Sequence, residues 1–183
     1  MNFMGFDTKN FTEINGKIWL YKNFLSKDEC KIEIEKIKNG NINKITENSA
    51  KEIYFDNKFI KDKLVKLMKK DAYIGDIMAY DTPINKFWAL HTDLNGETNK
   101  NYNKHWGIVG YLNSFEGGEL LFPGYGIIIK PEPGDLVIHH ASNSHSVALT
   151  KSDNRITYTA EIYTINIDLP PIERQKAIDF LVN

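Results

Sequence analysis

The chain from Tyr73 onward consists of short segments rich in β-branched and aromatic residues, separated by turn-forming residues. Gly-Gly, Pro-Gly and Ser-Asp-Asn sequences interrupt these segments, and such residues favour turns. The segments expected to be extended are Tyr73–Tyr80, Trp106–Asn113, Glu119–Phe122, Ile127–Lys130, Asp135–His139, His145–Leu149 and Ile156–Ile165. Many short strands at close, even spacing are typical of a β-sandwich or a barrel, and a jelly roll is the compact closed form. The sequence therefore predicts a mainly β fold of the jelly-roll type.

Other segments have the features of helices that would pack outside the strands. Ser26 and Glu29 have capping-box spacing, in which the hydroxyl and the carboxylate each accept a hydrogen bond from a backbone N–H that the helix leaves without a partner. A strand at Ile18–Phe24 is expected before this helix, and residues 41–57 are expected to be mostly loop with a short strand. The expected helices run from Ser26 to Gly40, from Ile60 to Met68 and from Pro171 to Val182.

Composition and charge favour one ordinary globular domain spanning residues 1–183, a length that can bury a substantial core. The net charge of −1 gives no strong signal for nucleic acid or for an acidic membrane surface. The single Cys30 cannot form an internal disulfide. The sequence has no signal-peptide pattern at Met1–Asn10 and no run approaching the roughly 18 apolar residues of a membrane span. We therefore expect a cytoplasmic protein, and the sequence does not indicate its oligomeric state.

One short stretch carries a potential metal site. If Leu90–Leu94 is extended, the side chains of His91 and Asp93 project to the same side, because successive side chains of a strand alternate between faces. His145, 52 residues after Asp93, would complete a set of two histidines and one carboxylate. Such a set leaves three octahedral positions open and is associated with non-haem Fe(II) oxygenases. The His-x-Asp tripeptide by itself is equally compatible with a polar surface turn.

A series of motifs from Ile18 to Tyr163 resembles the 2-oxoglutarate- and Fe(II)-dependent dioxygenases, and within them most closely the prolyl 4-hydroxylase branch. The run Phe24–Cys30 is similar to the strand and helix that open this branch. The resemblance implies a single dioxygenase domain with a double-stranded β-helix, the cupin-like jelly roll, and helices packed outside it. The motifs that carry it are, in order, His91-Thr92-Asp93, Tyr111-Leu112-Asn113, Gly117 to Pro123, Pro133-Gly134-Asp135, His145-Ser146-Val147 and Arg155.

The resemblance also implies a role for individual residues. Arg155, ten residues after His145, matches the basic residue that pairs with the far carboxylate of 2-oxoglutarate. Several prolyl 4-hydroxylases have lysine there, and arginine offers a planar fork for the same carboxylate. Tyr111 matches a tyrosine whose hydroxyl helps to hold this carboxylate, and Tyr80 aligns loosely with another aromatic residue of the family. The implied catalytic iron ligands are His91, Asp93 and His145.

The activity implied by the resemblance is hydroxylation of an unactivated carbon. The enzyme would bind Fe(II) and consume 2-oxoglutarate and O2, with ascorbate as a reductant. It would release succinate and CO2. The best substrate hypothesis is a prolyl residue in a peptide or protein, while a free amino acid or another small molecule stays open. One alternative is a nucleic-acid dealkylase of the same superfamily, which would favour a further arginine soon after Arg155, whereas the next one is Arg174. The other is a non-catalytic cupin-like module that binds a metal or a sugar.

The alternation of side chains along strands leaves two questions open: which of two adjacent histidines points inward, and whether His145 and Arg155 share a face. His139 and His140 are adjacent on one expected strand, so one of them must point inward as a core or cavity-wall histidine. If the strands of His145 and Arg155 form a hairpin, a three-residue loop Ser152–Asn154 would pair Lys151 with Arg155 and place both functional residues on one face. Asn154 would then take the left-handed conformation.

Overall fold

Antiparallel strands form most of the protein in a computed structural model that describes residues 9–46, 50–55, 57–68, 72–94, 102–165 and 170–182. The large sheet contains β1 (Thr12–Asn15), β2 (Ile18–Tyr21), β3 (Ile42–Ile45), β4 (Lys51–Tyr54), β5 (Ala72–Ile74), β6 (Met78–Thr82), β8 (Tyr102–Tyr111), β12 (Leu136–His140) and β15 (Arg155–Ile165). The small sheet contains β7 (Trp88–His91), β10 (Leu120–Phe122), β11 (Ile127–Ile129) and β13 (His145–Val147). Strands β9 (Glu116–Gly117) and β14 (Thr150–Ser152) form a separate pair.

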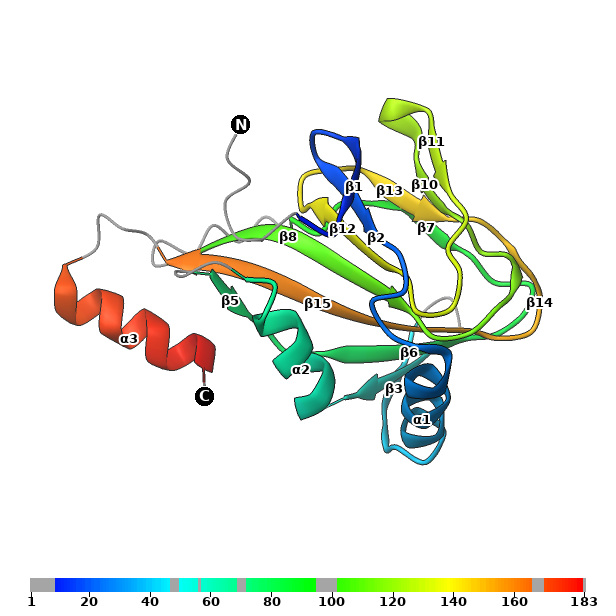
Figure 1. Ribbon diagram of the computed structural model, residues 1–183, viewed down its shortest axis with the longest axis horizontal. Helices are drawn as coiled ribbons and strands as arrows, with labels where there is room; N and C mark the ends of the chain where they lie inside the picture. Colours follow the sequence, from blue (N-terminus) through cyan, green and yellow to red (C-terminus); the bar gives the residue numbers. More distant parts are fainter. Residues whose placement is uncertain are drawn as a thin grey trace.

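The long strands β8 and β15 run side by side through the length of the large sheet (Figure 1). Its order is β1-β2-β12-β8-β15-β6-β4-β3, with β5 also paired to β15, and the small sheet has the order β11-β10-β13-β7. Alternation of side chains gives β15 two different faces. The inner face, toward a cavity, carries Arg155, Thr157, Thr159 and Glu161. The outer face carries the buried side chains of Ile156, Tyr158, Ala160 and Ile162.

Two helices cover the outer face of the large sheet. Helix α1 (Lys27–Lys38) buries Cys30 and Ile37, and helix α2 (Lys58–Val65) buries Ile60 and Leu64, in the same core cluster as the outer face of β15. In Figure 1 both helices lie on the side of the large sheet away from β10 and β11. The expected capping box is confirmed, since Ser26 Oγ accepts from Glu29 N at 3.2 Å and Ser26 N donates to Glu29 Oε2 at 2.7 Å.

A second core cluster, lying between the sheets, joins β8 and β12 to the small sheet. Its buried members include Val109 and Tyr111 of β8, Val137 of β12 and Phe122 of β10. The helix expected at the C-terminal end is found as α3 (Pro171–Val182). Among the described residues, no helix is long and apolar enough to span a membrane.

The expectation of mostly loop for residues 41–57 was wrong. Strands β3 and β4 pair antiparallel there and extend the large sheet beyond β6. Every residue of β3 is exposed, because β3 is the edge strand, so neither apolar alternation nor a buried run marks it in the sequence. The expected single strand Tyr73–Tyr80 is instead divided into β5 and β6.

The hairpin proposed between the strands of His145 and Arg155 does not form. Strand β14 pairs with β9, whereas β15 pairs with β5, β6 and β8, so the two residues belong to different sheets. Asp153, with φ 49°, takes the left-handed conformation expected of Asn154, and the Asn154 amide instead donates to Asp81 Oδ1 at 2.8 Å. His145 and Arg155 face one cavity because the two sheets oppose each other.

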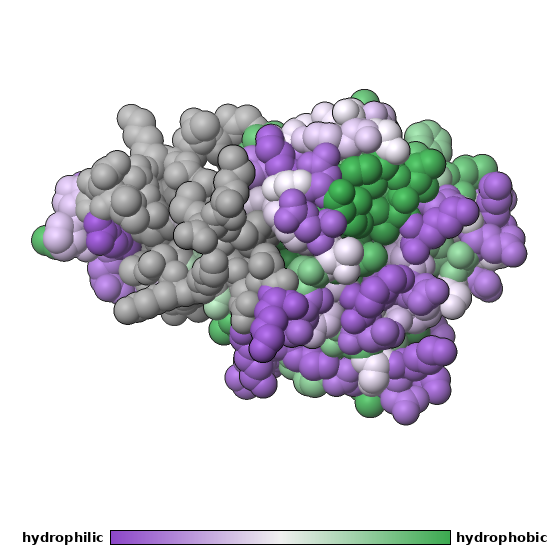
Figure 2. Space-filling view, turned by 45° about the horizontal axis from the view of Figure 1, so that its top comes forward, coloured by the Kyte–Doolittle hydropathy of each residue, from purple (hydrophilic) through white to green (hydrophobic). Residues whose placement is uncertain are grey.

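Hydrophilic residues cover most of the coloured surface in Figure 2, with one compact hydrophobic patch on the half of the molecule that carries the small sheet. In the small sheet, β11 is an edge strand made of three isoleucines, and Ile128 is 65% exposed. Large apolar side chains elsewhere on the described surface include Phe87 and Leu90, near the small sheet's other edge.

The helix cap gives a test of the fold. We expect Ser26→Ala to lower the free energy of unfolding by about 1 kcal/mol, because the N–H of Glu29 loses its acceptor. Ser26→Asp is the matched control, since aspartate also caps helices, and it should remain within about 0.5 kcal/mol of the native protein. Urea unfolding monitored by circular dichroism measures both values. Equal stability of the alanine and aspartate variants would contradict the role of the cap.

Candidate metal centre

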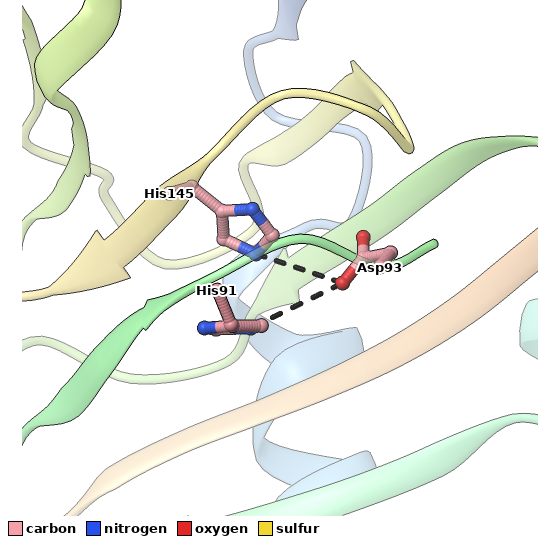
Figure 3. A group of neighbouring side chains, drawn as sticks. All are labelled: His91, Asp93 and His145. Carbon is pink, nitrogen blue, oxygen red and sulfur yellow. Dashed lines mark ion pairs between the residues drawn. The ribbon is translucent and has the colours of Figure 1, made fainter. Parts of the chain in front are cut away.

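Strand pairing brings His91 and His145 together. They are direct partners in the antiparallel pair β7–β13, and directly paired residues of such strands share a face. Their ring centroids are 4.3 Å apart. The strand ends at His91, short of the expected Leu94, but the backbone N–H of Asp93 donates to the carbonyl of Ala141 at 3.1 Å and holds the carboxylate beside both rings. Figure 3 shows the three side chains converging from β7, the segment after it, and β13.

The ligand atoms of these residues form a compact group. The Nε2 of His91 lies 4.0 Å from Asp93 Oδ1, and the Nε2 of His145 lies 3.7 Å from the same oxygen. All three ligand atoms lie within 4.8 Å of one another. The Nδ1 of His91 is 2.7 Å from the carbonyl oxygen of Ala89. The Nδ1 of His145 is 3.0 Å from that of Asn143. Because a carbonyl can only accept, each Nδ1 carries the hydrogen and each Nε2 lone pair is left for a metal.

Burial keeps His145 in the form that a metal needs. Removal from water is the main cause that lowers the pKa of His145, and the negative charge of Asp93 only partly opposes it. A neutral imidazole is the metal-binding form, whereas an imidazolium has no lone pair to offer. The donor set of two imidazole nitrogens and one carboxylate oxygen therefore fits a divalent transition metal with open coordination positions.

A buried arginine lies in the same cavity, which has a volume of about 170 Å³. Arg155 is 3% exposed, and its guanidinium carbon lies 5.2 Å from the Tyr111 ring centroid and 5.8 Å from that of Phe115. Its Nη1 donates to Thr157 Oγ1 at 3.4 Å. Among the described residues, Arg155 Nε and the Tyr111 hydroxyl have no hydrogen-bond partner of normal geometry, although the guanidinium and the hydroxyl interact with each other, and no carboxylate forms an ion pair with Arg155.

This arrangement leaves a buried positive charge to be balanced. Burial lowers the pKa of Arg155 and raises that of Tyr111, whose hydroxyl therefore stays protonated as a donor. An unpaired buried charge is costly, and a carboxylate accepts well from both a guanidinium and a phenol. The pocket around Arg155 and Tyr111 thus fits the carboxylate of a small organic acid.

Tyr80 stands in the wall between this cavity and an adjoining groove. Its hydroxyl donates to Glu52 Oε2 at 3.0 Å, and its ring meets Trp88 edge to face at 5.3 Å. Burial is the main cause that raises the pKa of Tyr80, and Glu52 adds to it. The groove has a volume of about 840 Å³ and shares Tyr80, Trp88 and His91 with the cavity. Phe87, 56% exposed, lines it from the side.

Solved structures with similar folds support the expected architecture. No protein-family model and no curated protein matches the sequence. The viral collagen prolyl hydroxylase of Paramecium Bursaria Chlorella virus-1, in complex with 2-oxoglutarate, superposes with a TM-score of 0.68 at 20% identity, over 83% of this chain and 98% of that one. The chain has the fold of the 2-oxoglutarate- and Fe(II)-dependent oxygenases. The double-stranded β-helix predicted from the sequence is thus confirmed.

Other structures of this fold come from different organisms. A Pseudomonas putida prolyl-4-hydroxylase has a TM-score of 0.60 at 17% identity, over 80% of this chain and 91% of that one. A Trichoplax adhaerens prolyl hydroxylase, in complex with a peptide fragment of the hypoxia inducible factor oxygen degradation domain, has a TM-score of 0.59 at 14% identity, over 88% of this chain and 87% of that one.

In this oxygenase fold the inward-pointing histidine of β12 is His139. It is fully buried, lines the cavity, and places its Nε2 3.5 Å from Asp93 Oδ2. His140 points to the other face of the strand, where its ring meets Trp106 edge to face at 5.0 Å. Trp106 is buried in the outer core, so of the two tryptophans near the ligand stretch only Trp88 lines the cavity. Sequence reasoning had not placed His139 among the functional residues.

His139 predicts a pH dependence of stability. Burial is the main cause that lowers its pKa, from the ordinary 6.5 to about 4. Between these values the unfolded chain binds a proton that the folded protein does not, so stability falls as the pH falls. We expect a loss of about 2 kcal/mol between pH 7 and pH 5 that His139→Leu lacks. Urea unfolding of the metal-free proteins at both pH values tests this. The same pH slope in both proteins would contradict it.

Proposed function

We propose that the protein is a 2-oxoglutarate-dependent Fe(II) oxygenase that hydroxylates an unactivated carbon. The observation that carries this proposal is the presence in one cavity of the His91, Asp93 and His145 ligand atoms and of the buried guanidinium of Arg155, which lacks a carboxylate partner among the described residues. Bound iron, with 2-oxoglutarate and O2, supplies the oxidising power for C–H hydroxylation, and succinate and CO2 are released. The resemblance in motif order and the shared fold support the same activity.

The protein's own residues bind and orient the reactants. His91, Asp93 and His145 would hold the iron, and a set of two histidines and one carboxylate would leave coordination positions open for the reactants. Arg155 binds the far carboxylate of 2-oxoglutarate through its fork of N–H groups, and Tyr111 donates its hydroxyl hydrogen to the same group. Both side chains are held by burial before the ligand arrives, so little reorganisation accompanies binding.

The groove beside the metal centre supports a peptide or protein as the substrate, with a prolyl residue as the target. It meets the cavity at Tyr80, Trp88 and His91, so a chain lying in it would pass the open side of the metal. Exposed apolar side chains on its walls, including Phe87 and Ile45, suit an apolar ring in an extended segment. The Trichoplax adhaerens neighbour was solved with a peptide, which is consistent with this choice.

The two alternatives lack a comparable observation. A nucleic-acid dealkylase would favour a second arginine close to Arg155, but the next one, Arg174, lies in α3. A cupin-like module that only binds a metal or a sugar would have no use for the buried guanidinium of Arg155, which lies in the cavity of the candidate metal ligands without a carboxylate partner among the described residues.

Asp93→Ala tests the metal centre. We expect the variant to lose more than about 99% of turnover, because removing one of three metal ligands leaves the metal held by two imidazoles. The measurement is succinate formed from 2-oxoglutarate with Fe(II), ascorbate and a pool of proline-rich peptides. Asp62→Ala, at an exposed position of α2, is the matched control and should keep native activity. Unaffected activity of Asp93→Ala would reject the metal triad.

Arg155→Leu tests the carboxylate pocket. We expect the dissociation constant of 2-oxoglutarate to rise at least about 100-fold, because a buried carboxylate would lose its counter-charge. The preference for 2-oxoglutarate over 2-oxovalerate, which lacks the far carboxylate, should disappear as well. Arg155→Lys keeps the charge and should keep part of this preference. Isothermal titration of the metal-loaded proteins measures these values, and an unchanged preference in Arg155→Leu would refute the assignment.

A further inference from the structure

His139 is a buried imidazole that the proposed function does not use. Its ring centroid lies 4.4 Å from that of His145 and 5.4 Å from that of Phe122, so it is held between a metal ligand and the core. Its Nε2 faces the cavity and has no hydrogen-bond partner of normal geometry among the described residues. Asp93 Oδ2 lies 3.5 Å from it. A buried ring nitrogen aimed at a carboxylate calls for an explanation.

The two oxygens of Asp93 face different histidines. His91 and His145 both approach Oδ1, whereas His139 approaches Oδ2. A metal held by the first two histidines therefore takes Oδ1, and Oδ2 is left with lone pairs that need a donor. Among the described residues, only His139, through its Nε2, has an ion-pair contact with Oδ2.

The hydrogen bonds of the neighbouring carbonyl decide the tautomer of His139. Its Nδ1 lies 3.3 Å from the carbonyl oxygen of His140, which already accepts from the N–H of Asn143 at 2.9 Å. A neutral imidazole has one N–H to give, and a bond to a charged carboxylate is roughly twice as strong as one to a neutral carbonyl. We therefore assign the hydrogen to Nε2, where a small adjustment of the 3.5 Å contact would let it donate to Asp93 Oδ2. His91 and His145 differ in distance, because their Nδ1 atoms lie 2.7 and 3.0 Å from carbonyl oxygens, closer than the 3.3 Å of His139 Nδ1.

The strand beside this pair has no room for a side chain at Gly107. Gly107 of β8 is the direct partner of His139 in β12, so both face the cavity. A Cβ atom at Gly107 would overlap Asp93 Oδ2 and come within 2.9 Å of His139 Cε1. The absence of a side chain at this position therefore lets the carboxylate and the imidazole lie side by side.

We propose that His139 is a positioning residue whose Nε2–H donates to Asp93 Oδ2 and so directs Oδ1 toward the metal with His91 and His145. This inference rests on the proposed metal site. Hydrogen-bonded partners of metal-binding carboxylates commonly strengthen metal binding 10- to 100-fold. His139 also keeps the carboxylate from turning its second oxygen to the metal, which preserves an open coordination position.

Co(II) binding to the metal-free protein tests the inference without requiring turnover. His139→Leu removes the donor, His139→Asn keeps a polar side chain too short to reach Asp93, and His139→Gln can place an amide N–H near the Nε2 position. We expect the Co(II) dissociation constant to rise about 10- to 100-fold for leucine and asparagine and to stay within about 5-fold of the native value for glutamine. His140→Gln is the matched control on the same strand and should bind like the native protein.

The outcomes separate the two proposals. A native protein that binds no Co(II) would overturn the metal site itself and this inference with it. Native binding with an unchanged dissociation constant in both His139→Leu and His139→Asn would overturn only the positioning role. Equal weakening by glutamine, leucine and asparagine would overturn the donor role in favour of direct ligation by the imidazole. The visible absorption of bound Co(II) reports the ligand set, and it should be alike in the native and glutamine proteins. Thermal melting of each metal-free variant establishes that it is folded.

Discussion

The pairing of β13 with β7 determines where the chemistry of this protein can occur. His145 lies directly opposite His91 in this pair, and both rings enter the space between the two sheets. A shift of one residue would turn one ring to the opposite face of the small sheet, because side chains alternate along a strand. The register is supported by β10, which pairs with β13 on its other edge and buries Leu120 and Phe122 in the inner core. The convergence of the candidate metal ligands thus depends on the packing of apolar residues outside the site.

The outer face of the large sheet packs the core, whereas its inner face lines the cavity. On the outer face, apolar side chains pack under α1 and α2 and supply most of the burial that stabilises the fold. On the inner face, His139 and Arg155 line the cavity and Tyr111 lies against the guanidinium, and among the described residues His139 Nε2, Arg155 Nε and Tyr111 Oη are buried without a hydrogen-bond partner of normal geometry. Each such atom costs about 1 to 3 kcal/mol. The outer core offsets this cost, and the cavity keeps polar groups ready for ligands.

Sequence reasoning predicted the jelly-roll class, the capping box of α1, the last helix and the convergence of His91, Asp93 and His145. These features leave local signals, namely turn residues, cap spacing and ligand spacing. The hairpin between His145 and Arg155 was wrong because strand pairing is a long-range choice, and here β15 pairs with β6 and β8 instead. The roles assigned to Arg155, Tyr111 and Tyr80 remain predictions. Arg155 and Tyr80 line the cavity, and Tyr111 lies against the guanidinium of Arg155.

The sequence left open which of His139 and His140 points inward from β12, for a different physical reason. Strand β12 is buried on both faces, with Val137 and Ile138 pointing in opposite directions and both apolar. A strand covered on both sides has no polar alternation, so the sequence cannot tell whether His139 or His140 faces the cavity. Only the partners of the strand decide this, through the pairing of His139 with Gly107.

The division of the two Asp93 oxygens has a consequence for the open side of the metal. A carboxylate that binds through Oδ1 alone uses one coordination position, and with His91 and His145 it leaves three of six positions open. Under the proposed function, a chelating keto acid and O2 would together need three open positions. If Oδ2 also bound, one of these positions would be lost. A donor at Oδ2, such as His139, would therefore help the site to hold both reactants at once. The position of this donor is determined by the pairing of His139 with Gly107 in the large sheet.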